Sequence, residues 1–236
     1  MLLFANGCSH TAGAEIEFPM QGNCYDKAWP KHLADMWGCD HVNLSRSGGS
    51  QKRILRTTIN FIGNCLLEGK DLKDIFVIIL WPGPYRTELF DPSFPTIHGD
   101  GWRTFCVGND YKNISKNMEN FYKSWVLAYD NETAKVTNLL DVISLQSYLK
   151  FWKIKYFFFR ASSTKLTTDR SHKPLAAQID ERLFPGAWRD GACFTDLLDV
   201  SPHNFSEFSR FRHYGEDGHK YFATVLDKMI KKAHNI

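Results

Sequence analysis

Residues 74–81, with the sequence DIFVIILW, decide the fold class, because the apolar run from Ile75 is ended abruptly by Pro82-Gly83-Pro84. A short apolar run without polar alternation is typical of a strand that is buried on both faces of a parallel sheet. Residues 2–5 have the same character, residues 39–44 are expected to form a second short strand, and residues 154–159 are expected to form a fourth, buried strand. The sequence therefore predicts a sheet of buried, mainly parallel strands.

Helical patterns separate these runs. Apolar residues recur at helical spacing in residues 26–37, in the segment that Gly69 closes, and in residues 115–150 with a break near Asp130-Asn131. A final amphipathic helix is expected over residues 218–232. Strands that alternate with helices indicate βαβ units. We expect one domain over residues 1–236, with a long insertion at about 89–113 that is rich in Pro, Gly, Asp and Asn.

The composition excludes several classes of function. The formal net charge of the 236 residues is only +3, which gives no basis for a nucleic-acid partner. The six cysteines form no C-x-x-C pair and no Cys/His cluster, so neither a metal nor another cofactor is expected. We find no signal peptide and no apolar stretch of membrane-spanning length. A cytoplasmic protein with reduced thiols and no membrane partner is the expectation.

Three loops at the predicted carboxyl ends of the strands carry unusual residues, at the place where open parallel sheets bind their ligands. They contain Gly7-Cys8-Ser9-His10-Thr11, Ser47-Gly48-Gly49 and Trp81-Pro82-Gly83-Pro84-Tyr85-Arg86. Near the C-terminus, residues 213–219 (HYGEDGH) precede the last helix. A serine in a strand-to-helix turn is either an ordinary helix N-cap or a nucleophile beside backbone N–H groups that can stabilise an oxyanion.

The order of these segments resembles the SGNH (GDSL) hydrolases. Gly7-Cys8-Ser9 is similar to the family's first block, with Cys8 in place of the aspartate, and Gly48 matches the glycine of the second block. His213 and Gly218 match the histidine and glycine spacing of the last block. The resemblance implies a three-layer α/β/α sandwich with a flavodoxin-like sheet. Phage-encoded and polysaccharide-modifying members often have similar Gly-Cys-Ser openings.

The resemblance also implies roles for individual residues. Ser9 would attack an ester, His213 would act as general base and then acid, and the N–H groups of Ser9 and Gly48 would hold the oxyanion. Arg86, Trp81 and His10 are the candidates for substrate binding, with His10 as pocket wall.

Two features depart from the family pattern. The third block lacks its asparagine, an oxyanion donor for which Arg86 is a candidate replacement, although pairing with Glu88 is an alternative role for Arg86. Position 210 is Arg, where the family has the aspartate of the triad. The site would then be a Ser-His dyad or use an acid from elsewhere, such as Asp196 or Asp199. A rival assignment takes His219 as the base, with Glu216 three residues before it.

Two functions remain from the sequence. The first is an esterase or deacetylase that hydrolyses a small ester or an acylated carbohydrate. The aromatic residues of the insertion and the family analogy are the grounds for carbohydrate. The second is a catalytically degraded SGNH-like domain that acts as a binding or structural protein, for instance in a virion, and the missing Asn and Asp favour it.

Overall fold

The computed structural model describes residues 1–17, 22–91, 101–108, 114–162, 172–185, 187, 193–201, 203, 205 and 213–236. Residues 92–100 and 109–113 of the predicted insertion lie outside the described residues, and so does Arg210.

The main sheet has four strands, β1 (Leu2–Gly7), β2 (Asp40–Asn43), β3 (Ile75–Trp81) and β6 (Lys155–Arg160). Their spatial order is β2-β1-β3-β6, and every neighbouring pair is parallel. The second strand along the chain therefore lies at one edge, beside the first, as in flavodoxin-like sheets. The predicted α/β class and sheet type are confirmed.

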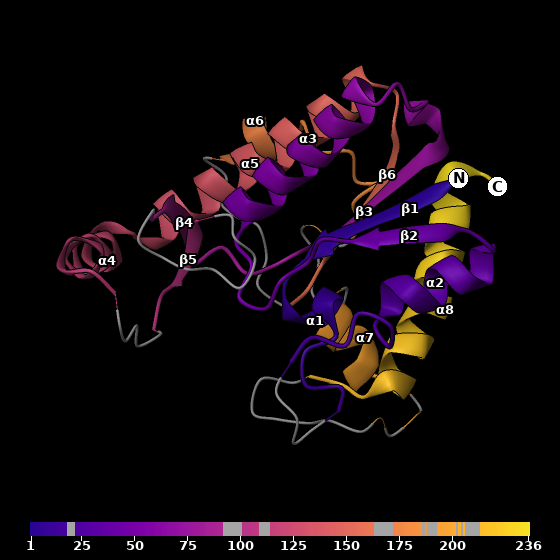
Figure 1. Ribbon diagram of the computed structural model, residues 1–236, viewed down its shortest axis with the longest axis horizontal. Coiled ribbons are helices and arrows are strands. Elements are labelled where there is room, and N and C mark those ends of the chain that lie inside the picture. Colours follow the sequence, from indigo (N-terminus) through magenta and orange to yellow (C-terminus); the bar gives the residue numbers. More distant parts are fainter. Residues whose placement is uncertain are drawn as a thin grey trace.

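Helices cover both faces of this sheet (Figure 1). On one face, α2 (Trp29–Trp37) packs against α8 (Glu216–His234), and on the other α3 (Gln51–Leu67) packs against α5 (Asn131–Phe151). The break predicted near Asp130 separates α5 from the preceding helix α4 (Lys116–Ala128). The short elements are α1 (Ser9–Ala12), the 3-10 helix Leu72–Asp74, α6 (Lys173–Ala176) and α7 (Phe194–Asp199).

The core lies between these layers and is largely aromatic. All residues of β3 are buried, and so are five of the six residues of β6. Trp29 of α2 and Phe222 of α8 meet edge to face, with ring centroids 5.7 Å apart. Each large apolar side chain that is fully buried contributes about 1.5–3 kcal/mol. This packing makes the sheet a rigid base for the loops at its carboxyl edge.

Part of the predicted insertion forms a β-hairpin, which the sequence did not indicate. Strand β4 (Arg86–Phe90) pairs with β5 (Trp102–Cys106) in antiparallel register, and α4 (Lys116–Ala128) follows. In Figure 1 these three elements extend to the left of the main sheet. The Arg56 side chain of α3 anchors the hairpin, through a bidentate ion pair with Glu88 and a position over the Trp102 ring.

Candidate active site

A cavity of about 770 Å³ opens at the carboxyl edge of the sheet. Its wall combines the loops after β1, β2 and β6, the start of β4, and the segment before α8. Five of the residues singled out from the sequence line this one cavity: Ser9, His10, Gly48, Arg86 and His213.

Ser9 begins the single helical turn α1 directly after β1. The turn requires glycine before it, because a Cβ on Gly7 would lie 2.3 Å from Thr11 Oγ1 and 2.9 Å from the Leu80 carbonyl oxygen. The Cys8 carbonyl accepts hydrogen bonds from the N–H groups of Thr11 and Ala12, both at 3.0 Å. The first N–H groups of a helical turn have no acceptor within the helix. Ser9 thus presents a half-buried hydroxyl beside donors that are suited to an anion.

Glu15 is the carboxylate that contacts His213. Its Oε2 lies 2.9 Å from His213 Nδ1, and both residues line the cavity. The His213 side chain is 10% exposed and that of Glu15 is 27% exposed, so solvent only partly screens the pair. A carboxylate at Nδ1 holds the proton on that nitrogen and leaves Nε2 with the lone pair that a general base needs.

The backbone of Glu15 is in the left-handed region, with φ of 62°. Non-glycine residues adopt this conformation at a cost of roughly 1–2 kcal/mol. The Glu15 N–H donates to the Gly22 carbonyl at 3.2 Å, and Ala14 forms a β-bridge with Asn23, so the conformation is held from outside. Strained backbone of this kind is frequent at functional sites.

His10 lies beside this pair. Its ring centroid is 5.0 Å from that of His213, with the rings nearly perpendicular. Burial, and to a lesser extent the charges of His213, His219 and Arg86, hold the pKa of His10 well below its usual value. His10 is therefore neutral at pH 7 and does not repel a proton on His213.

His219, the rival base, is not among the residues that line the cavity. Its Nδ1 accepts a hydrogen bond from the backbone N–H of Trp29 at 3.1 Å, at the first position of α2. Burial lowers the pKa of His219 to about 3. Glu216 bonds to Lys220 at 2.7 Å instead. The contacts of His219 are thus those of a buried helix cap.

The two aspartates considered as the third acid lie on α7. Asp199 accepts a hydrogen bond from the Tyr214 hydroxyl, and the Asp196 N–H bonds to Cys193 Sγ. The sequence left open a Ser-His dyad or an acid such as one of these aspartates, and it gave no indication of Glu15, the carboxylate that contacts His213. No motif marks it, because its partner lies 198 positions away along the chain.

The loop after β2 forms the opposite wall, where Gly48 adopts φ of 74°. A Cβ on Gly49 would lie 2.8 Å from the Gly7 carbonyl oxygen, so this loop and the end of β1 are in close contact. The Asn43 side chain joins them further, since it donates to the Thr11 carbonyl at 2.9 Å and accepts from the Ser45 N–H at 3.1 Å. The turn of Ser9 and the loop of Gly48 are therefore held as one unit.

Of the two substrate-binding candidates in the third loop, Arg86 lines the cavity and Trp81 does not. Trp81 is fully buried and meets Phe158 edge to face at 5.5 Å, so the structure places it in the core, away from any ligand. Arg86 donates to the Gly49 carbonyl through one terminal nitrogen at 3.0 Å. Glu88, which was considered as its partner, pairs with Arg56.

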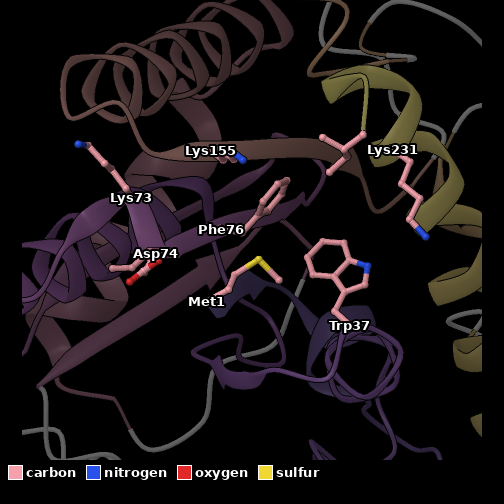
Figure 2. A pocket seen from close by; sticks show the side chains of 9 residues that line it. Met1, Trp37, Lys73, Asp74, Phe76, Lys155 and Lys231 are labelled. Carbon is pink, nitrogen blue, oxygen red and sulfur yellow. The ribbon is translucent and has the colours of Figure 1, made fainter.

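A second cavity, of about 370 Å³, lies at the other end of the sheet, where β3 and β6 begin. Figure 2 shows the side chains of Met1, Trp37 and Phe76 grouped there, with Lys73 and Lys231 on opposite sides. Lys231 is engaged with Asp227 at 2.9 Å. Among the residues that the structure describes, no serine, cysteine or histidine lines this cavity.

The residues that the structure describes contain no cluster of three or more His, Cys, Asp or Glu side chains that could hold a metal ion. None of their helices combines the length and hydropathy that crossing a bilayer requires.

Several solved structures are similar to this chain in fold at low sequence identity. Esterase EstA from Pseudoalteromonas sp. is 12% identical, with a TM-score of 0.52 over 100% of this chain and 99% of that one. A G-D-S-L family protein from Desulfitobacterium hafniense DCB-2 is 14% identical, with a TM-score of 0.52 over 97% and 98%. A carbohydrate esterase family 2 enzyme from Corynascus thermopiles is 12% identical, with a TM-score of 0.51 over 100% and 67%.

These likenesses establish an SGNH hydrolase-like fold, as the sequence resemblance implied. No curated protein matches the sequence. A family model described as a family of unknown function, DUF6071, matches residues 19–236, and the chain belongs to that family.

Proposed function

We propose that the protein is a serine hydrolase that cleaves small esters, with Ser9, His213 and Glu15 as its catalytic triad. The observation that carries the proposal is the 2.9 Å contact between His213 Nδ1 and Glu15 Oε2 in the wall of the cavity that Ser9 also lines. A histidine with a carboxylate at one nitrogen and a serine in the same cavity is the arrangement that activates a hydroxyl nucleophile.

The reaction would proceed in two steps. Ser9 Oγ forms a bond to the ester carbonyl carbon while its proton passes to His213 Nε2, and the alcohol leaves with that proton. Water then attacks the acyl carbon and loses a proton to His213. The bond from that carbon to Ser9 Oγ breaks as His213 returns the proton to Ser9, and the acid is released. Glu15 stabilises the imidazolium in both steps. The N–H groups of Ser9 and Gly48 are the proposed donors to the oxyanion.

The missing asparagine sets the expected rate. Loss of one oxyanion donor costs about 100- to 1000-fold in kcat, and neither Pro82 nor Pro84 has an N–H to offer. We therefore expect slow turnover of simple activated esters. An acylated carbohydrate remains a candidate natural substrate, in line with the carbohydrate esterase among the similar structures.

The test compares wild type with Ser9→Ala on p-nitrophenyl acetate. Ser162→Ala is the matched control, since Ser162 is another half-buried serine in the wall of the same cavity. We expect Ser9→Ala to abolish turnover and labelling by a fluorophosphonate, while Ser162→Ala retains both.

An inert wild type that no fluorophosphonate labels would refute the proposal. The absence of the third-block asparagine would then favour the alternative, a binding domain with an SGNH hydrolase-like fold.

A further inference from the structure

Arg86 places a positive charge in the cavity wall, and this charge has no carboxylate partner among the residues that the structure describes. Within the described residues, the hydrogen bond of its side chain runs to a neutral group, the Gly49 carbonyl. The two arginines that contact the hairpin strands through carboxylates are ion-paired, Arg56 with Glu88 at 2.8 Å and Arg103 with Asp91 at 3.6 Å. Arg86, at the start of the same hairpin, differs from them in this respect.

The other ionisable groups of the cavity wall do not neutralise Arg86. Glu15 is the acidic residue among those lining the cavity, and its carboxylate is engaged with His213. Burial keeps the pKa of His10 low, so that residue is neutral. Within the described wall of the cavity, the Arg86 guanidinium is therefore a positive charge that no carboxylate contacts.

The chemistry of the guanidinium indicates what would complete it. A guanidinium has several N–H donors in a planar fork that matches a carboxylate or a phosphate, and the Gly49 carbonyl engages one of its nitrogens. A half-buried cation gains most from an anion that binds the remaining donors. Because Gly49 follows Gly48, this fork lies next to the proposed oxyanion donor.

We propose that Arg86 binds an anionic group of the substrate, so that the enzyme prefers esters that carry a carboxylate or phosphate close to the scissile bond. The proposal rests on the proposed ester-hydrolase function and names its substrate class. Arg86 would determine specificity, and the alternative role, in which it replaces the missing asparagine as oxyanion donor, predicts a different result.

The experiment compares mono-p-nitrophenyl succinate, which is anionic, with p-nitrophenyl butyrate, a neutral ester with an acyl chain of the same length. We expect wild type to have the higher kcat/KM for the succinate ester. In Arg86→Met, the anionic-to-neutral ratio of kcat/KM should fall by about 10- to 100-fold, the usual effect of losing a charged hydrogen bond. Arg86→Lys should retain part of the preference, because it keeps the charge without the fork.

Arg182→Met is the matched control, since it removes the same charge from an exposed arginine that does not line the cavity. It should keep the wild-type ratio. If Arg86→Met lowers kcat equally for both esters, Arg86 is an oxyanion donor and the proposal is wrong. The proposal is also wrong if wild type shows no preference for the anionic ester.

A binding measurement separates this inference from the proposed catalysis. Titration calorimetry of Ser9→Ala with succinate and with inorganic phosphate needs no turnover, and its two arms distinguish the two anions. We expect at least one of them to bind, and Arg86→Met in the Ser9→Ala background to weaken that binding by 10-fold or more, on the order expected for a charged contact. Anion binding by an inert enzyme would refute only the proposed hydrolysis, whereas turnover without any anion binding would refute only the role of Arg86.

Discussion

Replacing Glu15 by Gln tests the feature on which the proposed catalytic site depends. The substitution keeps the size of the side chain and removes its charge. It also presents an amide N–H that can donate to His213 Nδ1, and a histidine that accepts at Nδ1 carries its proton on Nε2. That tautomer cannot take the proton of Ser9. We therefore expect Glu15→Gln to lower kcat and to leave KM nearly unchanged.

The size of the loss follows from the geometry of the pair. With Nδ1 and Oε2 2.9 Å apart, the centres of charge of an imidazolium and a carboxylate lie about 4 Å apart. At an effective dielectric constant of about 20, they attract by roughly 4 kcal/mol, which corresponds to about 1000-fold in rate. Because the Glu15 side chain is 27% exposed, water recovers part of this energy. A reduction of kcat by about 100- to 1000-fold is the expectation.

The assay is steady-state hydrolysis of p-nitrophenyl acetate by wild type, Glu15→Gln and Glu17→Gln. Glu17 is the matched control, because it lies two positions further on and pairs with Lys27 outside the cavity lining. Glu17→Gln should retain wild-type kcat. Retention of more than about a third of kcat by Glu15→Gln would refute the reasoning, since it would mean less than about 1 kcal/mol of transition-state stabilisation.

The variant Glu15→Gly tests whether misfolding could explain the loss of kcat on replacing Glu15. At φ of 62°, glycine relieves a strain of roughly 1–2 kcal/mol, which is partly offset by the greater freedom of the unfolded chain. We expect this variant to unfold at the same or a higher urea concentration than wild type while its kcat falls. A large loss of stability would show that Glu15 has a structural role instead.

Three further predictions concern the supports of the site. Since burial lowers the pKa of His219 to about 3, its neutral form stabilises the fold above the ordinary pKa, and this contribution is lost as pH falls. The advantage of wild type over His219→Gln in unfolding free energy should shrink by roughly 2 kcal/mol between about pH 7.5 and pH 5, and an unchanged difference in urea denaturation would contradict this. In Gly49→Ala, the new Cβ would lie 2.8 Å from the Gly7 carbonyl oxygen, so kcat should fall by at least about 10-fold and thermal unfolding should report a loss of about 1–3 kcal/mol. Asn43→Ala removes the link between the two loops, and we expect kcat to fall by about 10-fold with little change in KM, whereas equal changes in KM would point to lost substrate contacts.

The sheet could be predicted from the sequence because buried parallel strands leave a strong signal. Residues 75–81 and 156–159 are apolar without interruption, since helices cover both faces of the sheet. The hairpin gave no such signal. Strand Trp102–Cys106 alternates half-buried and buried residues, and its partner strand is separated from it by a polar, Pro- and Gly-rich stretch. The pairing depends on tertiary contacts such as Arg56 with Glu88, which no local pattern contains.

The sequence could predict only those site residues that lie close to the end of a recognisable strand. Ser9 and Gly48 follow strands directly, so their place at the carboxyl edge of the sheet follows from topology alone. Trp81 follows the same rule as the last residue of β3, yet its side chain is buried against Phe158, because helices cover both faces of the sheet. Glu15 could not be found in this way, since nothing in a sequence marks a glutamate that adopts a left-handed conformation.

Glu15 and His213 come from segments far apart in the chain, and this distinguishes the site from one in which acid and base lie in the same loop. Ser9 and Glu15 belong to one segment, joined through α1, and the bridge from Ala14 to Asn23 and the hydrogen bond from the Glu15 N–H fix its far end. His213 comes from the opposite end of the chain, and the bond from Tyr214 to Asp199 anchors the residue next to it. The relative position of Ser9 and Glu15, the proposed nucleophile and acid, therefore does not depend on the loop that contains His213. In the proposed mechanism, a displacement of His213 would remove the base from both Ser9 and Glu15, so the hydrogen bond that anchors Tyr214 would be needed for catalysis.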